Sequence, residues 1–279
     1  MIRNGSHDKQ VAEGVESVTA QLEGKSIIVT GAGRGLGEGI ATRLAREGAA
    51  VTIADINGPA AEQVAAAIRA AGGSARGATV DVAERSQVQA LIRDTVAAEG
   101  RLDVMFNNAG ISQARRFLDI EEADFERLMR VNGLGVPIGT QEAAKQFIAQ
   151  GGGGKVVNTA SIAGKQGFPL FAHYCASKFA VVALTQAAAR ALATHGITVN
   201  AICPGVVGTE LWSQLDEEFL RIGETTRTGQ AIEDFSTSIL LGRVADPHDL
   251  GGFAAFLASS DSDYITGQSI QIDGGMVLQ

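Results

Sequence analysis

Residues 26–40, SIIVTGAGRGLGEGI, decide the fold of this chain. Residues 27–29 are a wholly apolar run, typical of a buried parallel strand. Glycines then occupy every second position from Gly31 to Gly37, and a helical pattern begins at Ile40. A strand that turns through glycines into a helix directs backbone N–H groups and the positive end of the helix dipole at one point. The stretch therefore predicts a binding site for a pyrophosphate group.

Apolar runs and helical patterns alternate along the rest of the chain. The predicted strands cover residues 27–29, 49–54, 78–80, 102–106, 155–161, 198–203 and 269–275, and the predicted helices that follow the first one cover residues 59–71, 85–98, 121–150, 173–194 and 246–258. This alternation predicts the α/β class, with one doubly wound parallel sheet of about seven strands and helices on both faces. Residues 1–24 are predicted to be a polar arm, residues 25–279 one domain, and the irregular residues 206–242 a substrate lid.

The composition excludes several classes of function. The chain has 279 residues, of which 45% are hydrophobic and 19% charged, as in a globular enzyme. A formal charge of −8 disfavours nucleic acid or an anionic membrane as a partner. Cys175 and Cys203 are the only cysteines and have no metal-type spacing, so we expect neither a disulfide framework nor a metal site. The sequence contains no membrane-length apolar run and no signal core, so a cytoplasmic location is expected.

Asp55 stands at the carboxyl end of the second predicted strand. A carboxylate at this position can accept hydrogen bonds from both hydroxyls of an adenosine ribose. The alternative is a structural helix cap, a role that Asp often serves. The glycine turn that precedes Asp55 favours the ribose role.

The predicted helix over residues 121–150 contains unusual residues. Gly133, Gly135 and Pro137 fall inside it. Because proline has no N–H, the carbonyl of Gly133 should lose its helical partner, and the helix should bend there. Such a bend frees carbonyl groups close to Asn132.

Ser161, Tyr174 and Lys178 form the strongest candidate for a catalytic group. Tyr174 and Lys178 share a helix face, and Ser161 ends a predicted strand. A nearby ammonium should lower the pKa of the phenol, and the serine hydroxyl can hydrogen-bond a substrate oxygen. The alternative, an ordinary solvated helix face, is disfavoured by the other motifs. The adjacent Cys175 and His173 have no visible partner; Cys175 is expected in the core, whereas His173 could reach the mouth of the pocket.

These motifs together resemble the short-chain dehydrogenase/reductase family. Thr30, Gly31, Gly35 and Gly37 match its T-G-x-x-x-G-x-G spacing, whereas no register fits the commoner G-x-G-x-x-G. Residues 107–110 reproduce its N-N-A-G motif, in which asparagine side chains can also tie strand ends together. The resemblance covers about residues 24–279 and implies a Rossmann fold.

The resemblance also implies roles for individual residues. The implied catalytic residues are Asn132, Ser161, Tyr174 and Lys178. The backbone carbonyl of Asn132 would hold a water on the proton path. Asp81 would contact the adenine ring, unless it only caps a helix, and Val206 would lie in the loop near the nicotinamide. The implied cofactor-binding residues are Gly31, Arg34, Gly35, Leu36, Gly37, Asp55, Asp81, Val82, Asn108, Ala109, Gly110, Tyr174, Lys178, Pro204, Gly205, Val207 and Thr209.

Within the family, residues 174–181, 196–200 and 263–268 look like the polyol and vicinal-diol branch, which includes sorbitol, galactitol and butanediol dehydrogenases. Asp55, with no cation directly after it, favours NAD over NADP, and Arg34 is the one cation in the glycine loop. Ser161, Phe168, Tyr174 and Trp212 are the expected substrate contacts, although Trp212 could instead be a packing anchor. The small-molecule substrate would be an alcohol or ketone, and the assembly a homotetramer.

Two alternatives remain. A 3-oxoacyl-carrier-protein reductase would be expected to use NADPH and to carry a basic surface near the pocket, and both Asp55 and the negative charge disfavour it. A dinucleotide sensor without turnover would typically lack one member of the Ser161, Tyr174 and Lys178 group, and all three are present.

Overall fold

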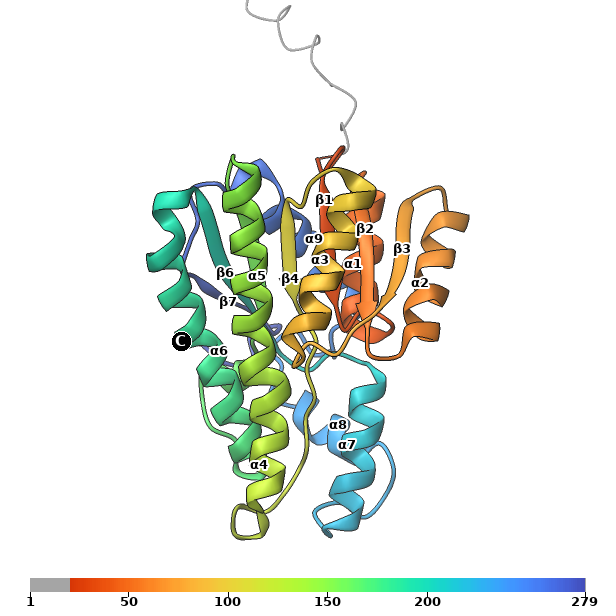
Figure 1. The fold of residues 1–279 in the computed structure, drawn as a ribbon. Helices are drawn as coiled ribbons and strands as arrows, with labels where there is room; N and C mark the ends of the chain where they lie inside the picture. Colours follow the sequence, from red (N-terminus) through yellow and green to blue (C-terminus); the bar gives the residue numbers. More distant parts are fainter. Residues whose placement is uncertain (1–20, 279) are drawn as a thin grey trace, which may run out of the picture.

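The computed structural model describes residues 21–278, so the predicted polar arm, residues 1–24, lies outside the described residues except for 21–24. The fold is built on one seven-stranded parallel sheet with the strand order β3-β2-β1-β4-β5-β6-β7 (Figure 1). The strands are β1 Ser26–Thr30, β2 Ala50–Asp55, β3 Ser74–Thr79, β4 Val104–Asn107, β5 Gly154–Thr159, β6 Ile197–Pro204 and β7 Ser269–Ile272. The predicted α/β class and doubly wound parallel sheet are confirmed.

The strand order reverses at β1, which lies between β2 and β4. At such a point the connections leave the sheet in opposite directions, and a crevice opens at the carboxyl ends of the strands. The glycine turn after β1 lies at this crevice.

The third strand differs from its prediction. It covers Ser74–Thr79 instead of residues 78–80 and pairs with β2 alone. As an edge strand it is only partly buried and carries Arg76, so it lacks the apolar run that marked the other strands.

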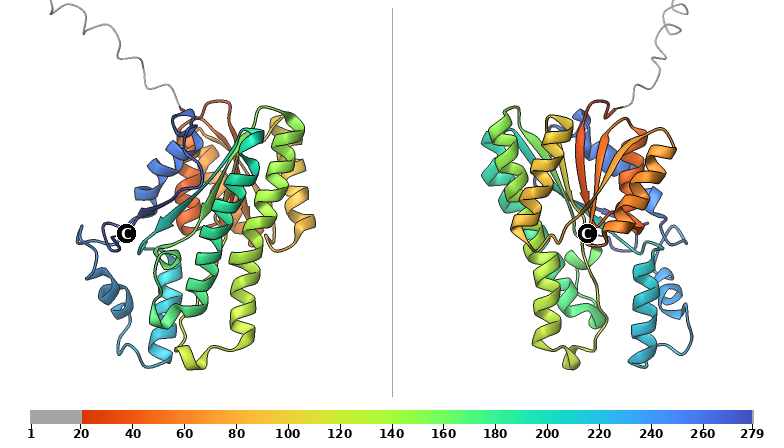
Figure 2. Two further views of the ribbon diagram at one scale, coloured as in Figure 1. Left: turned by 90° about the vertical axis from the view of Figure 1, so that its left-hand side faces the viewer. Right: turned by 45° about the vertical axis from the view of Figure 1, so that its right-hand side comes forward.

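Helices cover both faces of the sheet (Figure 2). On one face α1, α2 and α9 pack on Ile27 and Val29, and on the other α3, α5 and α6 pack on Ile28. Alternate residues of β1 therefore point to opposite faces, and both faces are apolar. The helices are α1 Gly35–Arg46, α2 Gly58–Ala70, α3 Arg85–Glu99, α4 Glu122–Leu128, α5 Gly135–Gln150, α6 Ala172–Leu192, α7 Glu210–Arg221, α8 Gln230–Ser236 and α9 Pro247–Ala258.

The irregular helix predicted over residues 121–150 takes a different form. α4 continues into a π-helical segment, Met129–Leu134, and then into α5. The π-helical segment contains Gly133, and Pro137 follows it inside one continuous helix, because Leu128, Leu134 and Gly135 all have helical backbone angles. An irregularity was expected at Gly133, and it is present there as a π-helical segment.

The segment after β6 is helical, not irregular as predicted. α7 and α8 lie below the carboxyl edge of the sheet in Figure 1. Asp216 of α7 accepts hydrogen bonds from the backbone N–H groups of Gly229 at 2.6 Å and Ala231 at 3.1 Å, so it holds the start of α8. No helix within residues 21–278 is long and apolar enough to cross a membrane.

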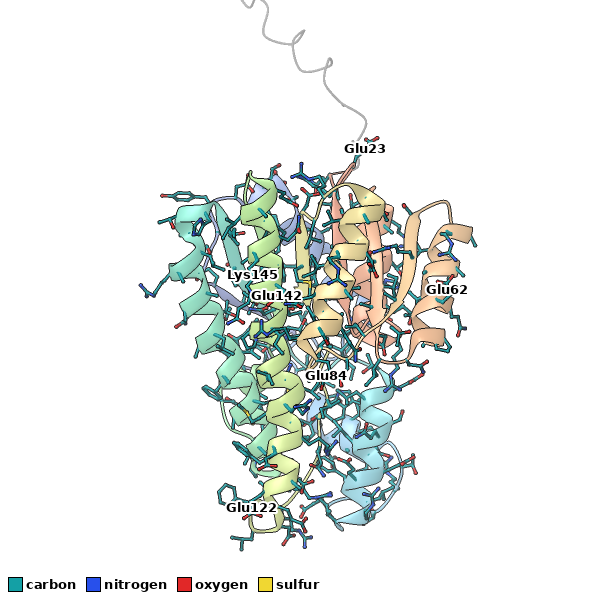
Figure 3. The ribbon with its side chains drawn as sticks, viewed as in Figure 1. Glu23, Glu62, Glu84, Glu122, Glu142 and Lys145 are labelled. Atoms are coloured by element: carbon teal, nitrogen blue, oxygen red, sulfur yellow. The ribbon has the colours of Figure 1, made fainter. Side chains whose placement is uncertain are left out.

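A buried carboxylate joins α3 to α5. Glu142 on α5 accepts hydrogen bonds from Gln89 at 3.1 Å, from Lys145 at 2.7 Å and from Arg85. Figure 3 labels Glu142 and Lys145 side by side on this helix. Burial alone would raise the pKa of Glu142, but the hydrogen bonds from Lys145, Gln89 and Arg85 outweigh it and lower the pKa.

Candidate active site

A cavity of about 340 Å³ opens at the carboxyl ends of the strands. All seventeen residues named above as cofactor contacts line it, together with Ser161 and Trp212. Asn132, Phe168 and Val206 do not line it. A larger hollow of about 660 Å³ lies against α1, α2 and the start of α9, but it contains none of the predicted catalytic residues.

The glycine turn allows a close backbone approach. Gly31 has a φ of +62°, and a Cβ there would lie 2.6 Å from the Cα of Ala109. A Cβ on Gly37 would lie 2.2 Å from the carbonyl oxygen of Gly31. Arg34, the N-cap of α1, makes no side-chain cap, so the first N–H groups of the helix face the cavity without a side-chain partner. This cradle fits a pyrophosphate group.

Asp55 is held against the glycine turn. Its Oδ2 accepts a hydrogen bond from Gly33 N–H at 3.0 Å, and its Oδ1 accepts one from Asn57 N–H at 2.9 Å. Each carboxylate oxygen keeps further acceptor capacity toward the cavity. Arg34, the cation of the glycine turn, forms an ion pair with Glu210 at 2.6 Å, and both side chains are 70% exposed.

The N-N-A-G motif ties three strand ends together. Asn108 Nδ2 donates to the carbonyl oxygens of Thr30 at 2.8 Å and Gly31 at 3.1 Å, and its Oδ1 accepts from Thr159 Oγ1 at 3.1 Å. The side chain therefore fixes the glycine turn relative to the end of β5.

Ser161, Tyr174 and Lys178 converge on one end of the cavity. Ser161 follows β5 and begins a short 3₁₀ helix, with its Oγ accepting from Ala163 N–H at 3.1 Å. Lys178 Nζ lies 5.7 Å from the centroid of the Tyr174 ring and donates to the carbonyl of Thr159 at 2.8 Å. Their i, i+4 spacing on α6 brings the two side chains to this point.

Burial dominates the electrostatics of this group. It raises the pKa of Tyr174 to about 12, although a hydrogen bond with Ser161 lowers it in part. The same burial lowers the pKa of Lys178 to about 8. The expected lowering of the Tyr174 pKa is thus wrong, because desolvation disfavours the charged form of the phenol and determines the direction of the shift.

Asn132 has a different environment from the other three. It lies in the π-helical segment and is fully buried. Its Oδ1 accepts from Ile111 N–H at 2.9 Å, and its Nδ2 donates to Ile111 O at 2.9 Å and to Ser177 Oγ at 3.0 Å. The side chain therefore joins the loop after β4 to α6, behind the cavity wall.

The remaining residues named in the sequence analysis lie either in the wall of the cavity or in the protein core. Trp212 lines the cavity and also packs on Phe235, with ring centroids 5.3 Å apart, whereas Phe168 packs on Phe235 at 6.4 Å. His173 and Cys175 are buried. Burial raises the pKa of the Cys175 thiol and lowers that of His173, and neither residue lines the cavity, so the expectation that His173 could reach its mouth is wrong.

Several cavity residues were not predicted. They are Ile56, Val80, Ile111, Val131, Thr159, Ala160, Glu210 and Leu211. Most are sequence neighbours of predicted residues at strand ends, which is the signal that could have identified them. Among the described residues, no group of three or more His, Cys, Asp or Glu side chains could hold a metal ion.

Known proteins share this architecture. The profile of a family described as Enoyl-(Acyl carrier protein) reductase matches residues 31–277. A diacetyl reductase [(S)-acetoin forming] of Staphylococcus epidermidis is 43% identical over 91% of this chain and 99% of its own length. An L-2,3-butanediol dehydrogenase of Corynebacterium glutamicum is 41% identical, over 91% and 98%. The crystal structure of an NAD+-bound xylitol dehydrogenase superposes with a TM-score of 0.87 at 35% identity, over 91% of this chain and 100% of that one.

Both the profile and the relatives extend across nearly the whole described fold, including the strand ends that form the cavity. The chain therefore belongs to the short-chain dehydrogenase/reductase family, and it is an oxidoreductase that acts on alcohol or carbonyl groups with a nicotinamide dinucleotide.

Proposed function

We propose that this enzyme transfers a hydride between NAD and a secondary alcohol or ketone of the vicinal-diol or polyol class. The observation that carries the proposal is the convergence of Ser161, Tyr174 and Lys178 in the cavity that also contains the glycine turn and Asp55. The diacetyl reductase, the butanediol dehydrogenase and the xylitol dehydrogenase support the substrate class.

The reaction needs a proton donor, an anchor for the substrate oxygen and a positive charge. Tyr174 exchanges the proton with the substrate oxygen, and Ser161 hydrogen-bonds that oxygen. The raised pKa of Tyr174 keeps the proton in place for carbonyl reduction. In the oxidation direction Tyr174 must first lose its proton, and the ammonium of Lys178 favours the phenolate. When bound, the nicotinamide ring exchanges the hydride at its C4.

Asn132 and the cofactor-facing residues position these groups. The backbone of Asn132 would support the water path, while its side chain fixes the π-helical segment against Ile111. Lys178 would also bind hydroxyls of the nicotinamide ribose, and Pro204 and Gly205 would cover the nicotinamide end.

Asp55 is the basis for choosing NAD over NADP. A 2′-phosphate at this position would bring two negative charges together, which costs several kcal/mol. The cation that could offset this repulsion, Arg34, is paired with Glu210. Trp212 would shape the substrate end under a lid formed by residues 206–242, whereas Phe168 packs on Phe235 and does not line the cavity.

We also propose a homotetramer located in the cytoplasm. Exposed apolar side chains on α4, α5 and α6, among them Phe125, Ile148 and Phe179, support an interface across these helices.

The test is reduction of NAD, followed by absorbance, over a panel of diols, polyols and hydroxysteroids. Replacing Tyr174 by Phe removes the proton-transferring hydroxyl and keeps the ring, so turnover should fall by at least ~10²-fold while NAD affinity stays nearly unchanged. If the Phe variant retains a tenth or more of wild-type turnover, Tyr174 does not transfer the proton.

A further inference from the structure

The wall of the cavity beside Tyr174 belongs to an aromatic cluster. Phe171 lies 6.3 Å from the Tyr174 ring and 5.9 Å from Phe235, and Phe235 lies 5.3 Å from Trp212. The cluster also takes in partly buried Leu211, which lines the cavity together with Trp212. Of this cluster, Tyr174 on α6 and Leu211 and Trp212 on α7 line the cavity, while Phe171 and Phe235 pack against them without lining it.

The polar side chains behind this wall are already paired with one another. Gln113 donates to Asp124 at 2.8 Å and lies 3.2 Å from His173. Glu218 accepts from the backbone N–H of Ala114 at 2.7 Å and from Gln214 at 3.2 Å, which holds α7 against the loop after β4. None of these side chains lines the cavity.

The hydrogen-bonding groups that remain near the reacting centre are few. Ser161 and Tyr174 serve one substrate oxygen, and the indole N–H of Trp212 can serve one more. Among the other polar residues of the cavity, Lys178 is assigned to the nicotinamide ribose, and Glu210 at the start of α7 is paired with Arg34. The rest lie at the glycine turn, at the strand ends or, as Thr209, at the N-cap of α7, in the part assigned to the dinucleotide. Two adjacent oxygens on the substrate can thus find partners, but further hydroxyls along its chain cannot.

We infer that the substrate is a small vicinal diol, hydroxyketone or dione whose carbon chain is apolar beyond the two oxygens, and that hexitols are poor substrates. The inference rests on the proposed function and narrows it. A polyol could stack on Trp212, but the hydroxyls around its edge would lose water without gaining partners. A hydrophobic pocket disfavours one added hydroxyl by up to about 10²-fold.

The experiment compares kcat/KM for butane-2,3-diol with kcat/KM for sorbitol and galactitol at saturating NAD, using the best stereoisomer of the diol. We expect the diol to exceed either hexitol by at least about 30-fold, equivalent to about 2 kcal/mol. A smaller ratio overturns the inference and leaves the proposed function standing. If no alcohol in the panel reduces NAD, the proposed function itself fails.

A matched pair of variants tests whether the wall causes this preference. Leu211→Asn places an amide in the wall and should shift the ratio toward the hexitols by at least about fivefold, since one unmatched hydroxyl gains a partner. Leu240→Asn makes the same change at a 72% exposed position outside the cavity and should leave the ratio unchanged. Equal ratios in wild type and Leu211→Asn would show that the wall does not select the substrate. If Leu211→Asn does not fold, the wild-type ratio decides the inference alone.

Discussion

Replacing Lys178 by Met should make the folded protein more stable at pH 7 while it abolishes turnover. Lys178 is 4% exposed and makes one hydrogen bond, to the carbonyl of Thr159. Its ammonium is costly to bury, and Met fills a similar volume without charge. The site therefore keeps a charge for catalysis at the expense of stability.

The magnitude follows from the pKa. Burial lowers the pKa of Lys178 from 10.5 to about 8, which disfavours the charged form by about 3 kcal/mol, at about 1.4 kcal/mol per pH unit. The Met variant loses the hydrogen bond to Thr159, worth about 1 kcal/mol. The net gain in the free energy of unfolding at pH 7 is about 2 kcal/mol, or about 4–8 °C in Tm.

The gain should shrink as the pH rises. Below about pH 8 Lys178 is charged in both states, so the wild-type folded state bears the full cost of burial. Between about pH 8 and pH 10 the folded state releases the proton while the unfolded state keeps it. The unfolded state then binds more protons, and wild-type stability rises with pH. The Met variant lacks this dependence, so the two proteins should converge near pH 10.

Urea unfolding of the nucleotide-free proteins at pH 7 and pH 9.5, followed by the fluorescence of Trp212, measures both effects at one protein concentration. Lys145→Met is the control, because Lys145 is 65% exposed and its replacement relieves no burial of charge, although it removes one hydrogen bond to Glu142. It should give no gain. A Lys178→Met variant less stable than wild type at pH 7, or a difference that does not change with pH, would refute the reasoning.

Three other predictions concern cofactor choice, stability and assembly. Asp55→Ser should reduce the preference for NAD over NADP by about 30-fold or more, because it removes a like charge beside the 2′ position. The measurement is kcat/KM for both cofactors on one substrate. Equal values for the two cofactors in the wild type would mean that Asp55 does not face the ribose. Glu142→Gln should lower Tm at pH 7 by about 2–6 °C through the loss of charged hydrogen bonds. Because the folded pKa of Glu142 is lowered, this stabilisation is present above the unfolded pKa of about 4.3 and is lost as the pH falls through the folded pKa, so the Tm difference should vanish in acid. Light scattering at micromolar concentration should give the mass of a tetramer, and a monomer would contradict the proposed interface.

The sequence was informative where local patterns decide the structure. A buried strand, a glycine turn and a helix are encoded within residues 26–40, and β1 and α1 follow them. Tyr174 and Lys178 are brought together by helix geometry alone, so their proximity could be predicted. The exposed edge strand β3 carries no apolar run and was placed too late in the chain.

Features that depend on distant contacts could not be predicted. The hydrogen bonds of Asn132, within the π-helical segment, to Ile111 and Ser177 are revealed by no sequence spacing. The pKa of Tyr174 is raised because several elements bury its side chain. The sequence showed only the nearby lysine, and reasoning from that charge alone predicted a lowered pKa. α7 and α8 are short helices among charged residues and turn signals. Their apolar side chains are recognisable as a packing face only once the structure shows them in one cluster with Phe171.

The packing of α7 and α8 has an evolutionary consequence. Their side chains enter the cluster around Phe171 but neither of the two clusters that flank the sheet. Mutations of their cluster residues can therefore accumulate without disturbing the apolar packing on either face of the sheet. Substrate preference can therefore change, in evolution or in laboratory selection, through substitutions in α7 and α8, while selection for folding acts on the rest of the chain.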